Sequence, residues 1–296
     1  MTRINIQFSL FSAFYSPLIS TISGGFLAAE GLEATWSESP AGVGAVAALE
    51  DGSAHVVQSA MSQSFGALAK GETPSAVHFA QINEMDGFFI TAREADADFL
   101  WDKLEGSDAV LFGGGQPLAM FKYACHKAGI DFDRINAIHP GGAAEIDKAF
   151  RDGQGQYTQQ QGPYPQQLQA DGVGHVVAQV GPLIGACAFS SLAATPEWLQ
   201  TDMASAFTRA YGRTRAYMND TPAAEIAGSE KSYFPDIDLA ALTDCIAAYQ
   251  QLGCWTPHME ITQDAFEATL DIYQYNGIIS ERYGYDQICA APPAID

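Results

Sequence analysis

The amino-acid sequence predicts an α/β fold built on a largely parallel sheet that is covered by helices. Strand patterns alternate with helix patterns through the first half of the chain. The 28 glycines suit tight strand-to-helix turns and close packing of helices on the sheet. With 47% hydrophobic residues, the 296-residue chain can build a sizeable core, either as two lobes or as one large domain.

The first third of the chain carries the strand–turn–helix rhythm most clearly. Its first ten residues predict a strand, because apolar and polar residues alternate. A polar and aromatic loop at 11–17 leads into a predicted helix from Pro17 to Glu30, with proline in its first turn and Gly31 as its C-cap. The elements predicted next are strands at 32–36, 55–57, 77–82 and 87–93, a helix at 45–50 and a helix ending at Lys70.

Beyond residue 93 an acidic stretch at 94–102 indicates a lobe boundary. The segment 154–169, rich in Gln, Gly, Pro and Tyr, is predicted to be a loop. From Thr195 onward the pattern is mostly helical, and Thr195–Glu197 predicts a helix N-terminus. The other predicted elements are strands at 108–112, 136–139 and 173–180 and helices up to Ala128 and over 143–151.

The charge balance excludes two classes of partner. The chain has 35 acidic and 14 basic residues, a formal charge of −21. Such a field repels nucleic acid, whose binding needs Lys and Arg at the phosphates, and it disfavours an anionic membrane surface. The excess is compatible either with solubility or a salty habitat, or with recruitment of cations.

Motifs for a cofactor or a metal are missing from the sequence. The five cysteines form no C-x-x-C pair, the six histidines are scattered, and Cys125 and Cys245 fit helices as buried apolar residues. The run at 113–116 is not a dinucleotide fingerprint, because Leu118 stands where glycine is needed. There is no Walker motif and no G-x-S-x-G elbow, so we expect neither cofactor nor metal.

The start of the chain and its hydropathy bear on the expected location of the protein. The start has a single Arg and no continuous apolar core, so it is not a secretory signal, and no window approaches a membrane span. The chain is therefore expected to be cytoplasmic, or to have lost a leader.

Several short motifs occur in a specific order: 25–33 (GFLAAEGLE), 47–52 with 55–60 (AALEDG, HVVQSA), 104–106 (LEG), 113–118 (GGGQPL) and 128–131 (AGID). In this order and spacing the chain resembles the thiamine-precursor-synthase-like (NMT1/THI5-like) family of ABC-transporter substrate-binding proteins, over essentially its whole length.

The resemblance implies two Rossmann-like lobes joined by two crossover strands, with ligand held in the cleft between them, the periplasmic binding protein type II fold. Lobe one would be 1–91 plus 187–296, and lobe two 92–186. It also implies a periplasmic location, a thiamine-precursor type of ligand and an ABC transmembrane permease as partner.

In open α/β sheets the ligand lies off the carboxyl ends of the strands. None of the fourteen Lys and Arg residues lies in the loops found there, so an anion could be held only by helix N-termini near 114–116 and 59–62. The loops concerned are 11–17, 37–44, 58–63, 83–87 and 113–117, joined by 139–143 and 159–165.

These loops carry aromatic rings, a methionine and neutral hydrogen-bonding groups, which suit a neutral, pyrimidine-like aromatic ligand. Glu38, Glu84 and Asp86 would also permit a cationic amine. The alternative is that Phe14 and Tyr15 pack in the lobe core and that Gln58 and Asn83 cap turns. The candidate ligand-binding residues are Ser12, Phe14, Tyr15, Glu38, Gln58, Ser59, Ala60, Ser62, Asn83, Met85, Gly114, Gly115, Gln116, Gln160, Gln161 and Tyr164.

Two alternatives to transport stay open. One is a cytoplasmic enzyme of the same fold, acting as a lyase or hydrolase on a small aromatic substrate. A desulfinase branch uses a cysteine in the first cleft loop, where this chain has Ser12 and Ser16, and serine needs an adjacent base. The other alternative is a sensor or storage binder without a transporter.

Overall fold

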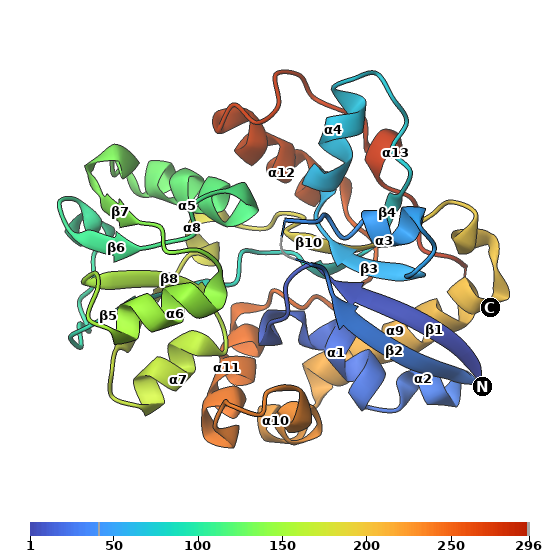
Figure 1. The fold of residues 1–296 in the computed structure, drawn as a ribbon, viewed down its shortest axis with the longest axis horizontal. Helices are drawn as coiled ribbons and strands as arrows, with labels where there is room; N and C mark the ends of the chain where they lie inside the picture. The colour runs from blue at the N-terminus through green and yellow to red at the C-terminus, as the bar shows by residue number, and fades with distance from the viewer. Residues whose placement is uncertain (41, 295–296) are drawn as a thin grey trace.

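The computed structural model describes residues 1–40 and 42–294, so residue 41 of the predicted 37–44 loop lies outside the described residues. Figure 1 shows two α/β lobes side by side, each built around its own sheet, with the chain passing between them at the centre. Both sheets have five strands. The α/β class predicted from the sequence is confirmed.

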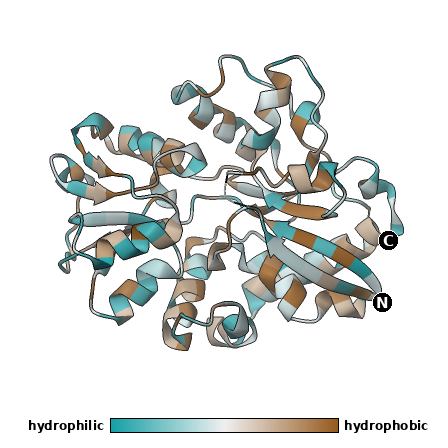
Figure 2. Ribbon diagram, viewed as in Figure 1, coloured by the Kyte–Doolittle hydropathy of each residue, from teal (hydrophilic) through white to brown (hydrophobic). Residues whose placement is uncertain are grey.

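The first sheet has the order β2-β1-β3-β10-β4. Strand β1 pairs in parallel with β2 and β3, whereas β10 runs antiparallel to both β3 and β4. Figure 2 shows apolar and polar residues alternating along β1, as one buried face requires. The bounds are β1 Thr2–Phe8, β2 Leu32–Glu38, β3 Val56–Ser59, β4 Val77–Asn83 and β10 Ser190–Ala194.

The second sheet has the order β7-β6-β8-β5-β9. Here β6 pairs in parallel with β7 and β8, and β5 runs antiparallel to β8 and β9. In each sheet four strands run in the same direction, as the sequence predicts, and the first strand after each crossing, β10 or β5, runs against its neighbours, so both sheets are mixed. The bounds are β5 Phe88–Ala92, β6 Asp108–Val110, β7 Asn136–Ile138, β8 Tyr157–Gln161 and β9 His175–Gln179.

The chain crosses between the sheets twice, at 84–87 and at 180–189. The two crossings are hydrogen-bonded to each other, with Cys187 N donating to Glu84 O (2.9 Å) and Phe189 N to Asn83 O (3.1 Å). Residues 88–91, which the sequence prediction assigned to lobe one, pair within the second sheet. The acidic stretch at 94–102 lies between β5 and β6 of the second sheet. It is therefore a loop within the second lobe and not the predicted lobe boundary.

The single helix predicted over 17–30 is two helices, α1 (Ser16–Ser23) and α2 (Phe26–Ala29). The break falls at Gly25, whose φ of 76° lies in the left-handed region that ends a right-handed helix. Apart from small shifts at their ends, the other helices predicted before residue 152 are present. They are α3 (Ala47–Glu50), α4 (Phe65–Leu68), α5 (Gly115–Ala128) and α6 (Ala143–Arg151).

The prediction of a loop at 154–169 was wrong. This segment forms β8 and the helix α7 (Tyr164–Ala170). Strand β8 lies between β6 and β5, and residues 158–161 are buried there. Pairing on both edges overrides a composition that is poor in residues typical of strands.

The C-terminal helices contact both lobes. Helix α11 packs against α7 of the second lobe, and α12 packs against α5. Thr201 rather than Thr195 caps α9, accepting a hydrogen bond from Ala204 N (3.2 Å), while Thr195 Oγ1 accepts one from Trp198 N (3.2 Å) at the start of a short 3-10 turn at 198–200. The bounds are α8 Gly181–Ile184, α9 Asp202–Asp220, α10 Ala223–Glu230, α11 Leu239–Leu252, α12 Gln263–Tyr275 and α13 Tyr285–Ile288.

The two cysteines predicted to be buried in helices are buried, Cys125 in α5 and Cys245 in α11. None of the helices in the described part of the chain is both long enough and apolar enough to cross a membrane.

Candidate functional site

A cavity of about 330 Å³ lies where strands of the two sheets end. Phe11 and Glu38 follow or end β1 and β2 of the first sheet, and Pro163 and Tyr164 follow β8 of the second. Residues 233–237, which connect α10 to α11, complete the lining. We call this cavity the interlobe pocket. Its position at the carboxyl ends of the strands and its size are those of small-molecule sites in α/β folds.

One wall of the interlobe pocket is aromatic. The ring of Phe11 stacks on Trp36 with centroids 4.7 Å apart and planes at 18°. Phe234 and Tyr233 lie 5.3 and 6.4 Å from Phe11, so four rings form one cluster. Sequence reasoning missed Phe11 and residues 233–237. The run Tyr233–Ile237, aromatic with a central proline between two helix patterns, was the available signal.

A hydrogen-bonded junction joins the lobes beside the pocket. Ser12 Oγ donates to Gly162 O (2.6 Å) and accepts from Phe14 N (3.1 Å). On the other side, Gly162 N donates to the Tyr249 hydroxyl (2.7 Å), which donates to Gly87 O (3.1 Å). Ser12 therefore fixes the two lobes at the residues next to Phe11 and Pro163.

Phe14 and Tyr15 lie in the core instead of the pocket wall. Phe14 is fully buried, with its ring 5.3 Å from Phe189 and 5.0 Å from Tyr249. The Tyr15 hydroxyl accepts a hydrogen bond from Gln161 Nε2 (3.3 Å), and burial raises the pKa of Tyr15 far above its usual range. Within the loop 11–17, the aromatic side chain that lines the interlobe pocket is Phe11.

Gln58 shapes the first loop. Its Oε1 accepts from Ser9 N (3.0 Å), Ser9 Oγ (2.8 Å) and Leu10 N (3.2 Å). These three bonds occupy the carboxamide oxygen and set the direction in which the chain leaves β1. Gln58 therefore acts on the pocket by positioning the backbone before Phe11.

Three other predicted residues lie in or contact the crossings and the strand ends beside them. Asn83 Nδ2 donates to Ser190 Oγ (2.9 Å), and Gln116 Nε2 donates to Phe189 O (2.6 Å). Met85 is partly buried and packs against Gly181 of the return crossing, where a Cβ would come within 2.8 Å of the methionine. These residues hold the hinge segments rather than line the pocket.

The remaining predicted residues surround the strand ends. Ser59 is fully buried, and within residues 1–40 and 42–294 its hydroxyl has no hydrogen-bond partner. Gln160 is buried, with Nε2 3.4 Å from Ala143 O. The structure brings Glu38 and Tyr164 together in the pocket and leaves Ala60, Ser62, Gly114 and Gly115 outside its lining, partly or fully exposed.

The three carboxylates proposed for an amine differ in their surroundings. Glu84 Oε2 lies 3.0 Å from His258 Nε2. Asp86 is fully buried in the first crossing, accepts from Phe88 N (2.7 Å), and burial raises its pKa to about 7. Glu38 is exposed and lines the interlobe pocket, so it is the one of the three that faces a ligand space.

A buried carboxyl supports the loop 11–17 from behind. Glu230 accepts hydrogen bonds from Ser16 Oγ and Ser20 Oγ, both at 2.6 Å. Burial raises the pKa of Glu230 to about 8, although the two hydroxyls lower it. Since its ordinary value of 4.5 applies to the unfolded chain, the folded state holds the extra proton between pH 4.5 and 8. This contribution to stability is complete below pH 4.5 and is lost as the pH rises through 8.

We expect Glu230→Gln to remove this pH dependence, because the neutral amide replaces the protonated acid. At pH 5 the free energy of unfolding of the variant should lie within about 1 kcal/mol of the wild-type value. By pH 9 it should exceed the wild-type value by an amount on the order of 2–4 kcal/mol. Urea unfolding at both pH values measures this. Glu225→Gln, an exposed position of the same helix, is the control. A parallel pH profile of Glu230→Gln and wild type would contradict the assignment.

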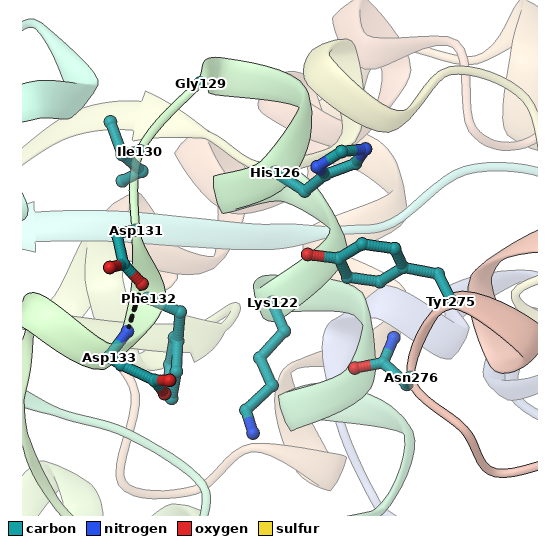
Figure 3. A pocket seen from close by; sticks show the side chains of 9 residues that line it. All are labelled: Lys122, His126, Gly129, Ile130, Asp131, Phe132, Asp133, Tyr275 and Asn276. Atoms are coloured by element: carbon teal, nitrogen blue, oxygen red, sulfur yellow. Dashed lines mark hydrogen bonds between the residues drawn. The ribbon is translucent and has the colours of Figure 1, made fainter.

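A larger hollow of about 650 Å³ lies between α5 and the end of α12 (Figure 3). Tyr275 reaches across to His126, with stacked rings 4.5 Å apart, and Lys122 Nζ lies 4.8 Å from the Phe132 ring centre. This hollow contains none of the predicted site residues and lies at the C-terminal end of α5. The interlobe pocket is therefore the candidate ligand site.

A serine–histidine pair lies within the first sheet. Ser191 Oγ and His78 Nδ1 are 2.6 Å apart, and both residues are buried between β10 and β4. Burial lowers the pKa of His78 to about 4. Ser12, by contrast, has Gly162 O and Phe14 N as its hydroxyl partners. Among the described residues, Ser191 is thus the serine with a histidine partner, and it does not line the interlobe pocket.

Two mixed sheets in separate lobes, two crossings and a pocket at the strand ends define a periplasmic binding protein type II fold. Residues 14–225 match the family model described as NMT1/THI5 like. The chain belongs to the NMT1/THI5-like family, which confirms the resemblance found in the sequence.

One relative is similar in sequence, and two solved structures share the fold. YtlA of Bacillus subtilis (strain 168), named as a binding protein, is 26% identical over 294 residues, covering 97% of this chain and 87% of YtlA. The alkanesulfonate-binding protein SsuA from Xanthomonas axonopodis pv. citri superposes with a TM-score of 0.71 at 15% identity, covering 95% of both chains. The ligand-binding component of an ABC-type import system from Staphylococcus aureus gives 0.75 at 14% identity, covering 98% of this chain and 97% of that one.

Proposed function

We propose that this protein is a solute-binding protein that captures a small polar or aromatic molecule between its lobes and presents it to an ABC-type importer. The observation that carries the proposal is the interlobe pocket, because its lining comes from strand ends of both sheets. The family, a relative named as a binding protein and a structure named as the ligand-binding component of an ABC-type import system support it. A periplasmic location and a transmembrane permease as partner follow from the same reasoning.

The mechanism we infer is hinge closure. The two crossings at 84–87 and 180–189 connect the lobes, and a ligand that touches Phe11 on one side and Tyr164 on the other stabilises the closed arrangement. The permease would then recognise the closed form.

For the ligand itself we propose a planar heterocycle, pyrimidine-like, such as a thiamine precursor. The ring cluster around Phe11 offers a stacking surface. One relative is named for binding alkanesulfonate. Among the residues that the structure describes, the interlobe pocket has no Lys or Arg in its lining to pair with a sulfonate, which favours a different ligand here.

Thermal unfolding against a library of pyrimidines, aromatic acids, amines, sulfonates and sugars tests the proposal. A true ligand at about 100 times its Kd should stabilise the protein by about 2.7 kcal/mol, and small-angle scattering should show compaction. The ligand should be recovered unchanged. Conversion to product would replace transport with the enzyme alternative, and the absence of any stabilising compound would refute capture in this pocket.

A further inference from the structure

The charged groups that line the interlobe pocket are all acidic. Glu38, at the end of β2, and Asp236, between α10 and α11, come from separate segments and are both exposed. Among residues 1–40 and 42–294 neither carboxylate takes part in an ion pair. No Lys, Arg or His is present in the described lining. The pocket therefore carries two uncompensated negative charges.

The electrostatic potential at Tyr164, on the second-lobe side of the pocket, is also negative. Burial is the main reason that the pKa of Tyr164 is raised, and the negative charges of Asp147, Glu38, Glu145 and Asp236 raise it further. Tyr164 belongs to the second lobe, so the negative potential extends across the pocket. A cation placed between the walls would be attracted by Glu38 and Asp236, whereas Asp147 of the second lobe is already paired with Arg151 (2.7 Å).

The nearest basic residue in the sequence is already engaged. Lys231 Nζ donates to Phe234 O and Pro235 O, both at 3.0 Å. These bonds tie the ammonium group to the backbone of the segment 233–237. Lys231 thus fixes the segment that presents Asp236, and it does not appear in the pocket lining.

The aromatic wall adds a second attraction for positive charge. Phe11 and Tyr233 belong to the ring cluster and line the pocket together with Tyr164. Ring faces attract ammonium groups, most strongly where water is partly excluded. A sulfonate or carboxylate would meet both the carboxylates and the ring faces unfavourably.

We propose that the interlobe pocket binds a small organic cation, with an ammonium group between Glu38, Asp236 and the aromatic rings. This inference rests on the proposed function and specifies its ligand class. Glu38 holds the cation from the first lobe and the Tyr164 ring contacts it from the second, so the charge itself favours closure. A pyrimidine-like ligand would satisfy this site when it carries a protonated amine.

Three probes with one ring and different charge test the inference: benzylammonium, benzyl alcohol and benzoate. Calorimetry on the full chain, with Trp36 fluorescence as a second readout, measures each affinity. Trp36 stacks on Phe11 and is partly exposed, so a ligand at this wall should change its emission. We expect benzylammonium to bind about tenfold more tightly than benzyl alcohol, and benzoate more weakly than both. Equal or tighter binding of benzyl alcohol or benzoate would overturn the inference.

Charge-neutral variants localise the effect. Glu38→Gln and Asp236→Asn should each weaken benzylammonium about three- to tenfold and leave benzyl alcohol unchanged. Glu33→Gln is the matched control, because it removes the same charge from the same strand roughly 16 Å away, at about 3.3 Å per residue. An equal loss in Glu33→Gln would show a general charge effect and refute the site.

The outcomes separate this inference from the function on which it rests. Compaction and stabilisation by neutral pyrimidines, with no preference for cations, would refute the cation site and leave solute capture intact. Failure of every compound in the library to bind would refute both.

Discussion

Replacing Gly162 by alanine is expected to disrupt the hydrogen-bonded contact between the two lobes and to lower the free energy of unfolding by about 2 kcal/mol. A Cβ at Gly162 would collide with Cys245 Sγ and lie 3.1 Å from the Tyr249 hydroxyl. That hydroxyl binds Gly162 N and Gly87 O, and Ser12 binds Gly162 O. The substitution therefore disturbs the junction from both lobes at once. Ligand affinity should fall with stability, because Pro163 and Tyr164 of the pocket follow directly.

The control is Gly228→Ala on α10, where an added Cβ meets nothing within 4 Å. Since alanine is the better helix former, this variant should be stabilised by roughly 0.5–1 kcal/mol, with ligand binding unchanged. Urea unfolding and calorimetry with the best library ligand measure both effects. If Gly162→Ala matches wild type in stability and affinity, the junction does not hold the lobes as described.

The second large effect is expected at Arg215, which is 1% exposed. Its guanidinium donates to Ile82 O (2.8 Å) and to Thr256 O, and lies 3.2 Å from the Tyr211 hydroxyl. Arg215→Met keeps much of the apolar stem but leaves the carbonyls of buried Ile82 and partly buried Thr256 without these donors. We expect the free energy of unfolding to fall by about 3 kcal/mol or more, since each unsatisfied buried polar group costs about 1–3 kcal/mol.

Arg213→Met on the same helix is the matched control. Arg213 pairs with Glu30 at 2.8 Å, and its side chain is 45% exposed. A surface pair of this kind is worth about 0–1 kcal/mol. Thermal and urea unfolding should therefore show a much larger loss of stability for Arg215→Met than for Arg213→Met. Similar losses of stability in the two variants would contradict the role given to Arg215. Because Ile82 lies in β4 immediately before the first crossing, the Arg215 variant should also bind ligand more weakly.

Patterns that depend on neighbours in sequence predicted much of the fold. Alternation in the first ten residues predicted β1, and the helix pattern closed by Gly129 predicted the end of α5. Short-range features such as period, caps and turns are written in the local sequence, so they could be recognised there. The order of motifs also resembled the NMT1/THI5-like family, which the family model confirms.

The pocket required residues that are distant in the sequence to come together. Glu38 and Tyr164 were predicted, whereas Phe11 and Asp236 were not, because 11 and 236 meet only when α10 and α11 pack beside the strand ends. Phe14 was chosen for its place in the loop 11–17, yet only packing against Phe189 and Tyr249 decides that it is a core residue.

By itself the sequence determined the α/β class, the family and the acidic character of the chain. Only the tertiary structure decided that β8 forms from a glutamine-rich segment, that Phe11 rather than Phe14 lines the pocket, and that Glu38 rather than Glu84 or Asp86 faces it unpaired. The physical reason is that periodicity and caps act over a few residues. Burial, strand pairing and the compensation of charge depend on partners supplied by distant parts of the chain.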